Sequence, residues 1–191
     1  TYIYPYKMKN TGTGKNYGIE LTLERFFNNG YYFLITSSLY DSKYTGSDEN
    51  KYNTAFNGRY ILNTLGGKEW EIGKNKTNAR FNKTISISGK MTIAGGQRYT
   101  PVNVEASQML ARTIYYDDRA YSEQFKDYFK IDLKVGFRLN GKKVTHELAF
   151  DLKNITNHEN PLLRRFDVNS GETITIYQQK FIPLAMYKIE F

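Results

Sequence analysis

The sequence predicts an all-β fold built from long antiparallel strands, and three observations point to it. Apolar and polar residues alternate along most of the chain, which places them on opposite faces of a strand. Tyr and Phe, which favour strands, make up 17 and 12 of the 191 residues. The last five residues, 187–191, alternate in the same way up to a terminal Phe. A solvated terminus is usually polar, so this ending indicates a strand with one apolar face.

Composition narrows the class of protein further. The chain has no Cys, so it has no disulfide framework and no thiolate chemistry. No stretch approaches 18 apolar residues, which excludes a membrane-spanning helix but not a β-barrel, whose strands turn only alternate residues toward lipid. The net charge of +8 is scattered, with no run of five basic residues, and therefore gives no support to nucleic acid as a partner.

Seven strands are predicted, at residues 17–24, 31–40, 59–72, 79–94, 126–139, 144–155 and 173–191, with a partial strand at 1–7. The first alternates from Tyr17 to Glu24 and ends at a tight turn, Asn28-Asn29-Gly30. The second is apolar on both sides at its start, so its two faces are harder to separate. The third ends at a turn that begins at Gly73.

The later strands have clearer faces. In the fourth, Ile85, Ile87 and Met91 share one side, opposite Ser and Thr. The fifth and sixth alternate strictly and are joined by Asn140-Gly141, a strong hairpin signal. The seventh runs to the end of the chain. In the sixth strand His146 falls in register with the apolar face, which favours an interface position over catalysis.

Connections of two lengths alternate along the chain. Turns near 28–30, 73–78 and 140–143 are short, whereas the stretches 41–58, 95–125 and 156–171 are long. Long loops at one end and short turns at the other are typical of transmembrane β-barrels. Strands of this length suit a tilted membrane crossing better than a soluble sandwich. Because seven is odd and a barrel tolerates no open edge in lipid, we expect residues 1–191 to be one sector of a larger barrel.

Several phrases resemble the C-terminal barrel of TonB-dependent outer-membrane receptors, in particular the outer-membrane β-barrel protein family. They are Asn16 to Leu21, Asn53 to Tyr60, Gly67 to Trp70, Gly95 to Pro101, Asp151 to Asn157 and the terminal Phe191. The resemblance implies a barrel of roughly 22 strands closed by an N-terminal plug. It also implies a place in the Gram-negative outer membrane and a role in ligand uptake driven by the TonB complex. Nothing like the plug occurs in this sequence, so this chain alone is not expected to transport.

The partners implied are outer-membrane lipid, the rest of the barrel with its plug, the TonB complex, the barrel-assembly machinery and, as one possibility, a surface lipoprotein. The ligand stays open between a siderophore, a glycan, a peptide and a vitamin. Two other interpretations also stay open. One is a soluble β-sandwich that binds carbohydrate, and the other is a small outer-membrane barrel enzyme. The enzyme needs a matched nucleophile and base, which no motif here provides, so we expect no enzymatic activity and no cofactor.

Candidate ligand contacts lie in the 95–125 loop, because loops on a rigid scaffold carry recognition and Tyr and Arg are enriched there. They are Arg98, Tyr99, Arg112, Tyr115, Tyr116, Asp117 and Asp118. Packing between loops or against the plug is the alternative for each of them. Asp117-Asp118 lacks further ligands for Ca²⁺, so no metal site is predicted. The candidate barrel-assembly signal is the apolar side of the last strand, Tyr187, Ile189 and Phe191.

Overall fold

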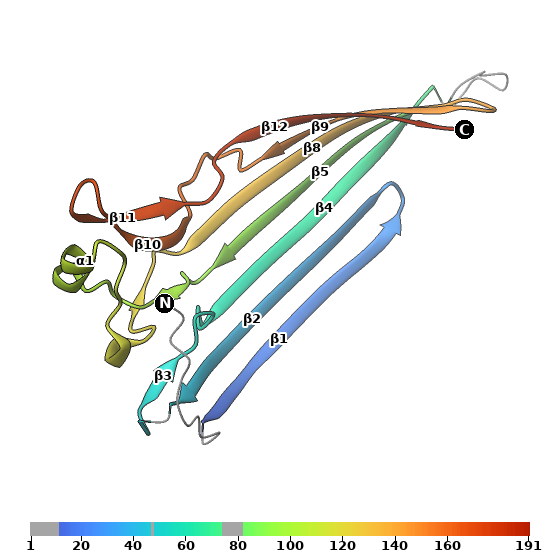
Figure 1. The fold of residues 1–191 in the computed structure, drawn as a ribbon. Coiled ribbons are helices and arrows are strands. Elements are labelled where there is room, and N and C mark those ends of the chain that lie inside the picture. The colour runs from blue at the N-terminus through green and yellow to red at the C-terminus, as the bar shows by residue number, and fades with distance from the viewer. Residues whose placement is uncertain (1–11, 47, 74–81) are drawn as a thin grey trace.

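The structure is a computed structural model in which residues 12–46, 48–73 and 82–191 are described. They form an antiparallel sheet of eight strands, in which each long strand pairs with the next long strand along the chain (Figure 1). The long strands are β1 (Thr13–Asn28), β2 (Tyr31–Thr45), β4 (Tyr60–Ile72), β5 (Asn82–Ala94), β8 (Tyr128–Asn140), β9 (Thr145–Lys153) and β12 (Ile182–Glu190). The short β3 (Lys51–Asn53) pairs with the end of β2. The prediction of an antiparallel all-β fold is confirmed. Across the described residues the sheet is open, with β1 and β12 at its edges.

Strand register gives the sheet one continuous apolar face. Ile87 of β5 pairs with Val135 of β8, which pairs with Phe150 of β9, so the three side chains share a face. The face extends across the whole sheet through Ile19, Leu21 and Leu23 on β1, Ile35 and Leu39 on β2, Leu62 and Trp70 on β4, and Ala185, Tyr187 and Ile189 on β12. The alternation in the sequence therefore coincides from strand to strand.

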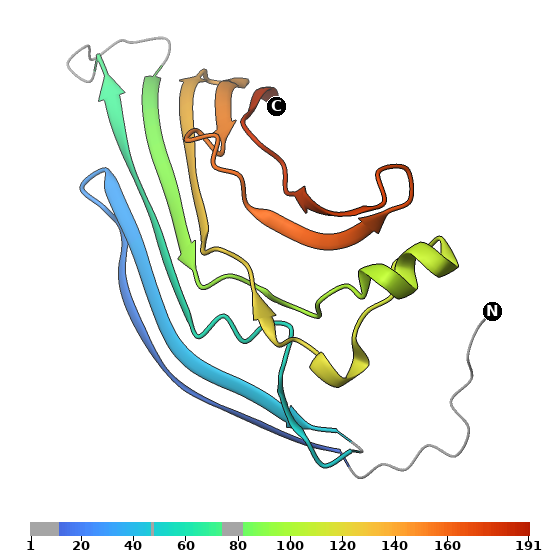
Figure 2. The same cartoon turned by 90° about the vertical axis from the view of Figure 1, so that its left-hand side faces the viewer.

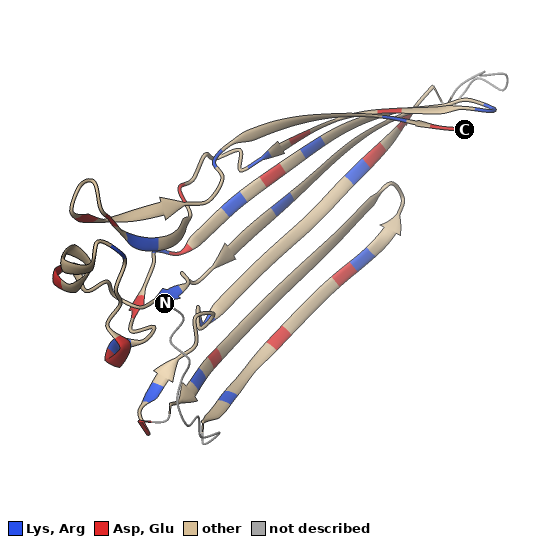
Figure 3. Ribbon diagram, viewed as in Figure 1, with Lys and Arg blue, Asp and Glu red and all other residues tan. Residues whose placement is uncertain are grey.

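The opposite face is polar, and charged residues recur along β8 (Figure 3). Asp132 lies 3.3 Å from Lys130 of the same strand and 3.8 Å from Lys153 of β9. Arg138 donates to the Glu147 carboxylate at 3.1 Å. These pairs satisfy charges on the polar face across two strands, as cross-strand partners of opposite sign do.

The apolar face has no second layer over it. Ile19 and Leu21 are 78% and 70% exposed. Among the described residues the buried apolar side chains are only Ala149, Phe166 and Pro101. A water-soluble domain of similar size buries most of its apolar side chains in an enclosed core. The described strands are therefore a single curved layer (Figure 2) whose apolar face must meet something other than water.

Short turns lie at one end of the sheet and long connections at the other, as predicted (Figure 1). The Asn29-Gly30 turn has positive φ at both residues, 53° and 81°, the conformation that two-residue hairpin turns require. The long connections contain elements that the sequence did not indicate. They are β6 (Arg98–Tyr99), α1 (Val104–Leu110), the 3₁₀ helix η1 (Asp117–Arg119), β7 (Glu123–Gln124) and β10 (Pro161–Asp167). β10 forms a hairpin with β11 (Glu172–Tyr177), which lies at the start of the predicted last strand.

The predicted last strand at 173–191 is wrong as a single element. It divides into β11, which leaves the main sheet to pair with β10, and β12, which pairs with β9. Between the two, Gln178 N donates to Asn160 O at 2.8 Å and Phe181 N donates to Asn157 Oδ1 at 3.1 Å. Hydrogen bonds to the preceding connection thus stabilise a bend between β11 and β12, which the alternation of apolar and polar residues over 173–191 did not predict.

The first two strands are longer than predicted because their polar ends pair with each other. Ser42 Oγ donates to Asn16 Oδ1 at 2.6 Å, and Tyr17 Oη donates to Asp41 Oδ2 at 3.1 Å. The sequence at these ends resembles loop, yet each polar group finds its partner across the strands. The predicted partial strand at 1–7, most of the turn at 73–78 and the start of the fourth strand at 79–81 lie outside the described residues.

Candidate functional site

The long connections gather at one end of the sheet, on its concave side (Figure 2), and line an open cavity of about 560 Å³. We call it the loop-end cavity. Its lining comes from four separate segments of the chain: Tyr44, Ala55, Gln97, Arg98, Tyr99, Thr100, Tyr115, Asp117, Ala120, Tyr121, Phe125, Leu162, Leu163 and Arg164. Tyr44 lies on the same side of β2 as Thr36, the polar face. The cavity therefore opens on the polar side of the sheet, opposite the uncovered apolar face.

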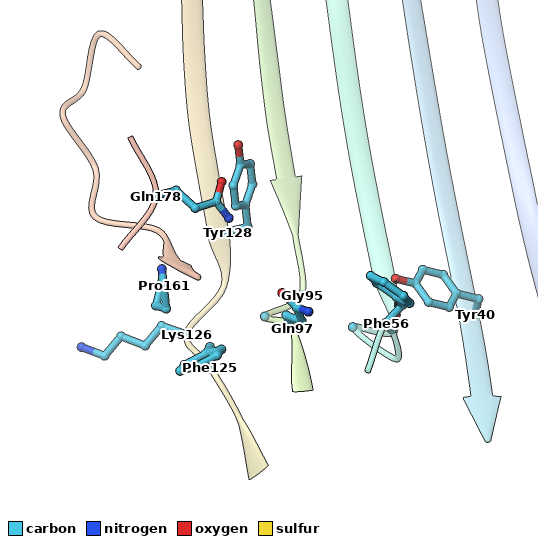
Figure 4. A pocket seen from close by; sticks show the side chains of 11 residues that line it. Tyr40, Phe56, Gly95, Gln97, Phe125, Lys126, Tyr128, Pro161 and Gln178 are labelled. Carbon is cyan, nitrogen blue, oxygen red and sulfur yellow. Dashed lines mark hydrogen bonds between the residues drawn. The ribbon is translucent and has the colours of Figure 1, made fainter. Parts of the chain in front are cut away.

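A second hollow of about 180 Å³ adjoins the first and shares Gln97 and Phe125 with it. Figure 4 shows its labelled side chains converging from strands and connections on both sides of β5. Tyr40 and Tyr128 come from the polar face of the sheet, and Pro161 and Gln178 come from the β10–β11 hairpin and its end. The two hollows make one concave region in which all three long connections meet.

Buried Asn side chains attach these connections to the strand ends. Asn57 and Asn154 are 0% exposed and Asn160 is 2% exposed. Asn160 accepts from Phe129 N at 2.9 Å and donates to Phe129 O at 2.8 Å, which copies a β-bridge. Asn154 donates to the carbonyl oxygens of His158 and Gln179 at 2.9 and 3.3 Å. Because every such amide is satisfied inside, the connections have defined positions and not a range of loop conformations.

Glycines allow two connections to cross at close range beside the cavity. A Cβ on Gly95 would lie 1.7 Å from the Gly58 carbonyl oxygen, and one on Gly96 would lie 2.0 Å from the Phe125 carbonyl oxygen. No side chain fits at those distances, so glycine is required at both positions. The phrases around Asn57-Gly58 and Gly95-Gly96, which carry the family resemblance, are thus the places where the loops are joined.

Arg98 is one of the residues that line the cavity, and its side chain is 8% exposed. Its backbone N donates to Ala55 O at 3.0 Å, and its side-chain Nε donates to Asn57 O at 3.1 Å. Burial, followed by the nearby charge of Arg59, lowers the pKa of Arg98, although an Arg side chain stays protonated in proteins. The cavity lining therefore includes a largely buried cation, the side chain of which donates one hydrogen bond, from Nε, in the described part of the chain.

Tyr99, Phe125 and Arg164 form the aromatic and cationic wall of the cavity. The rings of Tyr99 and Phe125 stack with centroids 4.2 Å apart. Arg164 Nη1 donates to Tyr99 Oη at 3.0 Å, and its guanidinium carbon lies 5.8 Å from the Tyr99 ring centroid. Burial, more than the interaction with Glu123, raises the pKa of Tyr99 and keeps its hydroxyl neutral. The wall is therefore apolar across its stacked rings and positive at one edge.

The structure brings together four of the seven predicted ligand contacts. Arg98, Tyr99, Tyr115 and Asp117 line the loop-end cavity, and Arg112, Tyr116 and Asp118 do not. The sequence did not point to several other lining residues, among them Tyr44, Phe125 and Arg164. Tyr44 lies in β2 and Arg164 in β10, and only tertiary folding places them beside residues 95–125. Phe125 lies at the end of the predicted loop, where its packing gave no sequence signal.

Asp117 and Asp118 begin η1, and both side chains are exposed. No group of three or more potential metal ligands occurs in the part of the chain that the structure describes. In the same residues no helix has the length and apolar character needed to cross a membrane.

The predicted assembly signal lies at the free edge of the sheet. Tyr187 and Ile189 are on the apolar face of β12, where they pair with Leu148 and His146 of β9. Phe191 is 99% exposed. His146 lies on the apolar face near the short-turn end, as predicted, and its Nδ1 is 2.9 Å from Tyr187 Oη.

Compared with protein-family models, curated proteins and solved structures, this chain matches none of them. Its function must therefore be argued from its residues and its fold.

Proposed function

We propose that this chain is a sector of a transmembrane β-barrel that belongs to a TonB-dependent outer-membrane receptor. The single observation that carries the proposal is the uncovered apolar face, which is continuous across all seven long strands of an otherwise single-layered sheet. A bilayer covers such a face without a second protein layer. The opposite polar face, with its paired charges, suits the wet interior of a barrel.

The margins of the apolar face fit the two interfaces of a bilayer. Tyr17 lies at the long-connection end, while Tyr31 and Trp70 lie at the short-turn end. Cations accompany the second pair: the Arg25 guanidinium carbon is 4.1 Å from the Tyr31 ring centroid, and Lys68 Nζ is 5.3 Å from the Trp70 ring centroid. Aromatic rings and basic side chains at one level are typical of the headgroup region of a membrane.

The open edges favour a larger barrel over an independent one. Outer hydrogen-bonding groups of β1 and β12 have no strand partner among the described residues. Unpaired backbone groups are not tolerated in lipid, so further strands must complete the closure. We propose that these strands and a plug belong to the same parent receptor, and that the barrel-assembly machinery recognises the β12 edge through Tyr187, Ile189 and Phe191.

In this arrangement the two ends of the sheet have different roles. Short turns face the periplasm, and long connections face outward and meet the ligand. The TonB complex acts on the plug and not on this sector, so the sector contributes recognition and a wall of the pore. A surface lipoprotein that covers the long connections would be compatible with this orientation.

Fractionation and gel mobility of the parent protein test the proposal. We expect the parent in the outer membrane, with an electrophoretic band that shifts after heating, because intact barrels resist unfolding by detergent at room temperature. A stable monomer of residues 1–191 in detergent-free buffer would instead favour the soluble β-sandwich. The control is to express residues 1–191 alone and to compare their solubility in buffer with and without detergent.

A further inference from the structure

We propose that the loop-end cavity binds the carboxylate of a ligand through Arg164 and Arg98, with a flat apolar part of that ligand against Tyr99. This names a ligand class for the proposed receptor, and it rests on that function for its placement on the outer side. The chemistry of the cavity itself does not depend on the membrane. Two sources share the required chemistry, sugar acids and aromatic acids, and the test below separates them.

Unmatched positive charge is the first line of support. Within the described chain, neither Arg98 nor Arg164 has a carboxylate within ion-pair distance. Asp117 is the acidic side chain among the lining residues and pairs with neither of them. The lining itself carries two cations and one exposed acid and is therefore net positive, while Asp41 near Arg98 and Glu123 near Tyr99 offset part of this charge from outside the lining. An anionic group in the cavity would offset the desolvation of both guanidinium groups.

Unused hydrogen-bond donors are the second line of support. Arg164 Nη1 donates to Tyr99 Oη, but the Arg164 Nε is buried without any partner in the described part of the chain. The Arg98 side chain uses one donor, Nε, which is directed to Asn57 O. A guanidinium group has five donors in a planar fork that matches the two oxygens of a carboxylate. Natural structures rarely leave a buried donor unused, so Arg164 Nε lacks an expected acceptor, as Arg25 Nε does elsewhere in the described chain.

The aromatic wall of the cavity determines which group of the ligand can lie beside its carboxylate. Tyr99 stacks on Phe125 at 4.2 Å, and Tyr115 Oη donates to the Arg164 carbonyl oxygen at 3.2 Å, so these rings are held in place. Stacked and braced aromatic rings offer a flat face at little cost in conformational entropy. A sugar ring or an aromatic ring fits such a face. An extended peptide fits it less well, because most of its residues have no flat ring.

The experiment uses the parent receptor, folded in detergent, and ligand-observed NMR, which detects weak binding. Probes are tri-galacturonate for a sugar acid and salicylate for an aromatic acid. The uncharged matches are the methyl ester of the trisaccharide and salicylamide. We expect one acid to bind at least about tenfold more tightly than its uncharged match, because hydrogen bonds to charged groups contribute more than neutral ones. Equal binding of each acid and its match, or binding of neither acid, would overturn the proposal.

Variants test the residues. Arg164→Gln should weaken binding of the acid by roughly ten- to a hundredfold, the range for loss of a charged hydrogen bond. The matched control is Arg165→Gln, the same change on an exposed neighbour that does not line the cavity. Tyr99→Phe removes the hydroxyl that holds Arg164 Nη1 and should weaken binding severalfold without altering the charge. Equal effects of Arg164→Gln and Arg165→Gln would refute the assignment.

The two proposals fail separately. If the electrophoretic band of the parent shifts on heating but neither acid binds, the barrel proposal is supported and the carboxylate site is refuted. If the protein binds an acid through Arg164 but is soluble without detergent, the carboxylate site is supported and the barrel proposal is refuted. If another segment of the parent fills the cavity, neither acid binds, and that outcome also rejects the carboxylate site.

Discussion

Adjacent residues of one strand provide a direct test of which face meets lipid. Ile35 and Thr36 of β2 point to opposite faces: Ile35 pairs with Leu23 and Thr64, and Thr36 pairs with Thr22 and Asn63. A tilted crossing needs about 9–11 residues, so a crossing that begins at Tyr31 has its middle near these two positions. The same substitution at both sites therefore compares the two faces at equal depth.

Ile35→Arg should destabilise the parent barrel by about 2–4 kcal/mol, the cost of Arg on the lipid face near the bilayer midplane. At about 1.4 kcal/mol per factor of ten, this lowers the folding equilibrium constant roughly 30- to 700-fold. Thr36→Arg places the charge among Thr22 and Asn63 on the polar face, where surface substitutions change stability by about 0.5 kcal/mol or less. Denaturant unfolding in phospholipid vesicles measures both values.

The dependence of the stability cost on depth in the sheet distinguishes a bilayer from a packed protein layer over the apolar face. Ile72 ends β4 at the short-turn end of the apolar face, where the interface would lie. Ile72→Arg should therefore cost about 0–1 kcal/mol, because the penalty falls toward the interface. An equal penalty at Ile35 and Ile72 would indicate a protein layer over the face. A larger penalty for Thr36→Arg than for Ile35→Arg would refute the orientation of the sheet.

Three further predictions follow from the same geometry. Spin labels at Ile87, Leu133 and Phe150 should be relaxed by oxygen dissolved in lipid and labels at Ser86, Lys134 and Asp151 should not, because the two sets lie on opposite faces; the reverse pattern would end the barrel proposal. Deletion of Phe191 in the parent should lower the amount of heat-shifted barrel in outer-membrane fractions, and an unchanged amount would exclude an assembly role. Gly95→Ala should destabilise the parent, because its Cβ would lie 1.7 Å from the Gly58 carbonyl oxygen, whereas Gly14→Ala meets nothing within 4 Å and serves as the control in the same denaturant titration.

Alternation by itself determined the larger part of the fold. A strand places successive side chains on opposite faces, so residues such as Ile85, Ile87 and Val135 identify both the strands and the apolar face. The Asn29-Gly30 turn is equally local, because it needs only positive φ at two neighbouring residues. From these signals the sequence predicts the strands, their antiparallel order and the ends at which short and long connections lie.

The tertiary structure decided what depends on distant partners. The bend between β11 and β12 is held by Asn157 and Asn160, and no pattern within residues 173–191 reveals it. The loop-end cavity likewise joins Tyr44 of β2, Arg98 of β6 and Arg164 of β10, so only folding could show that the two arginines share it while Arg112 lies elsewhere. Periodicity reports which way a side chain points along its own strand. It carries no information about which loops meet, because loop contacts are set by hydrogen bonds and close approaches between residues far apart in sequence.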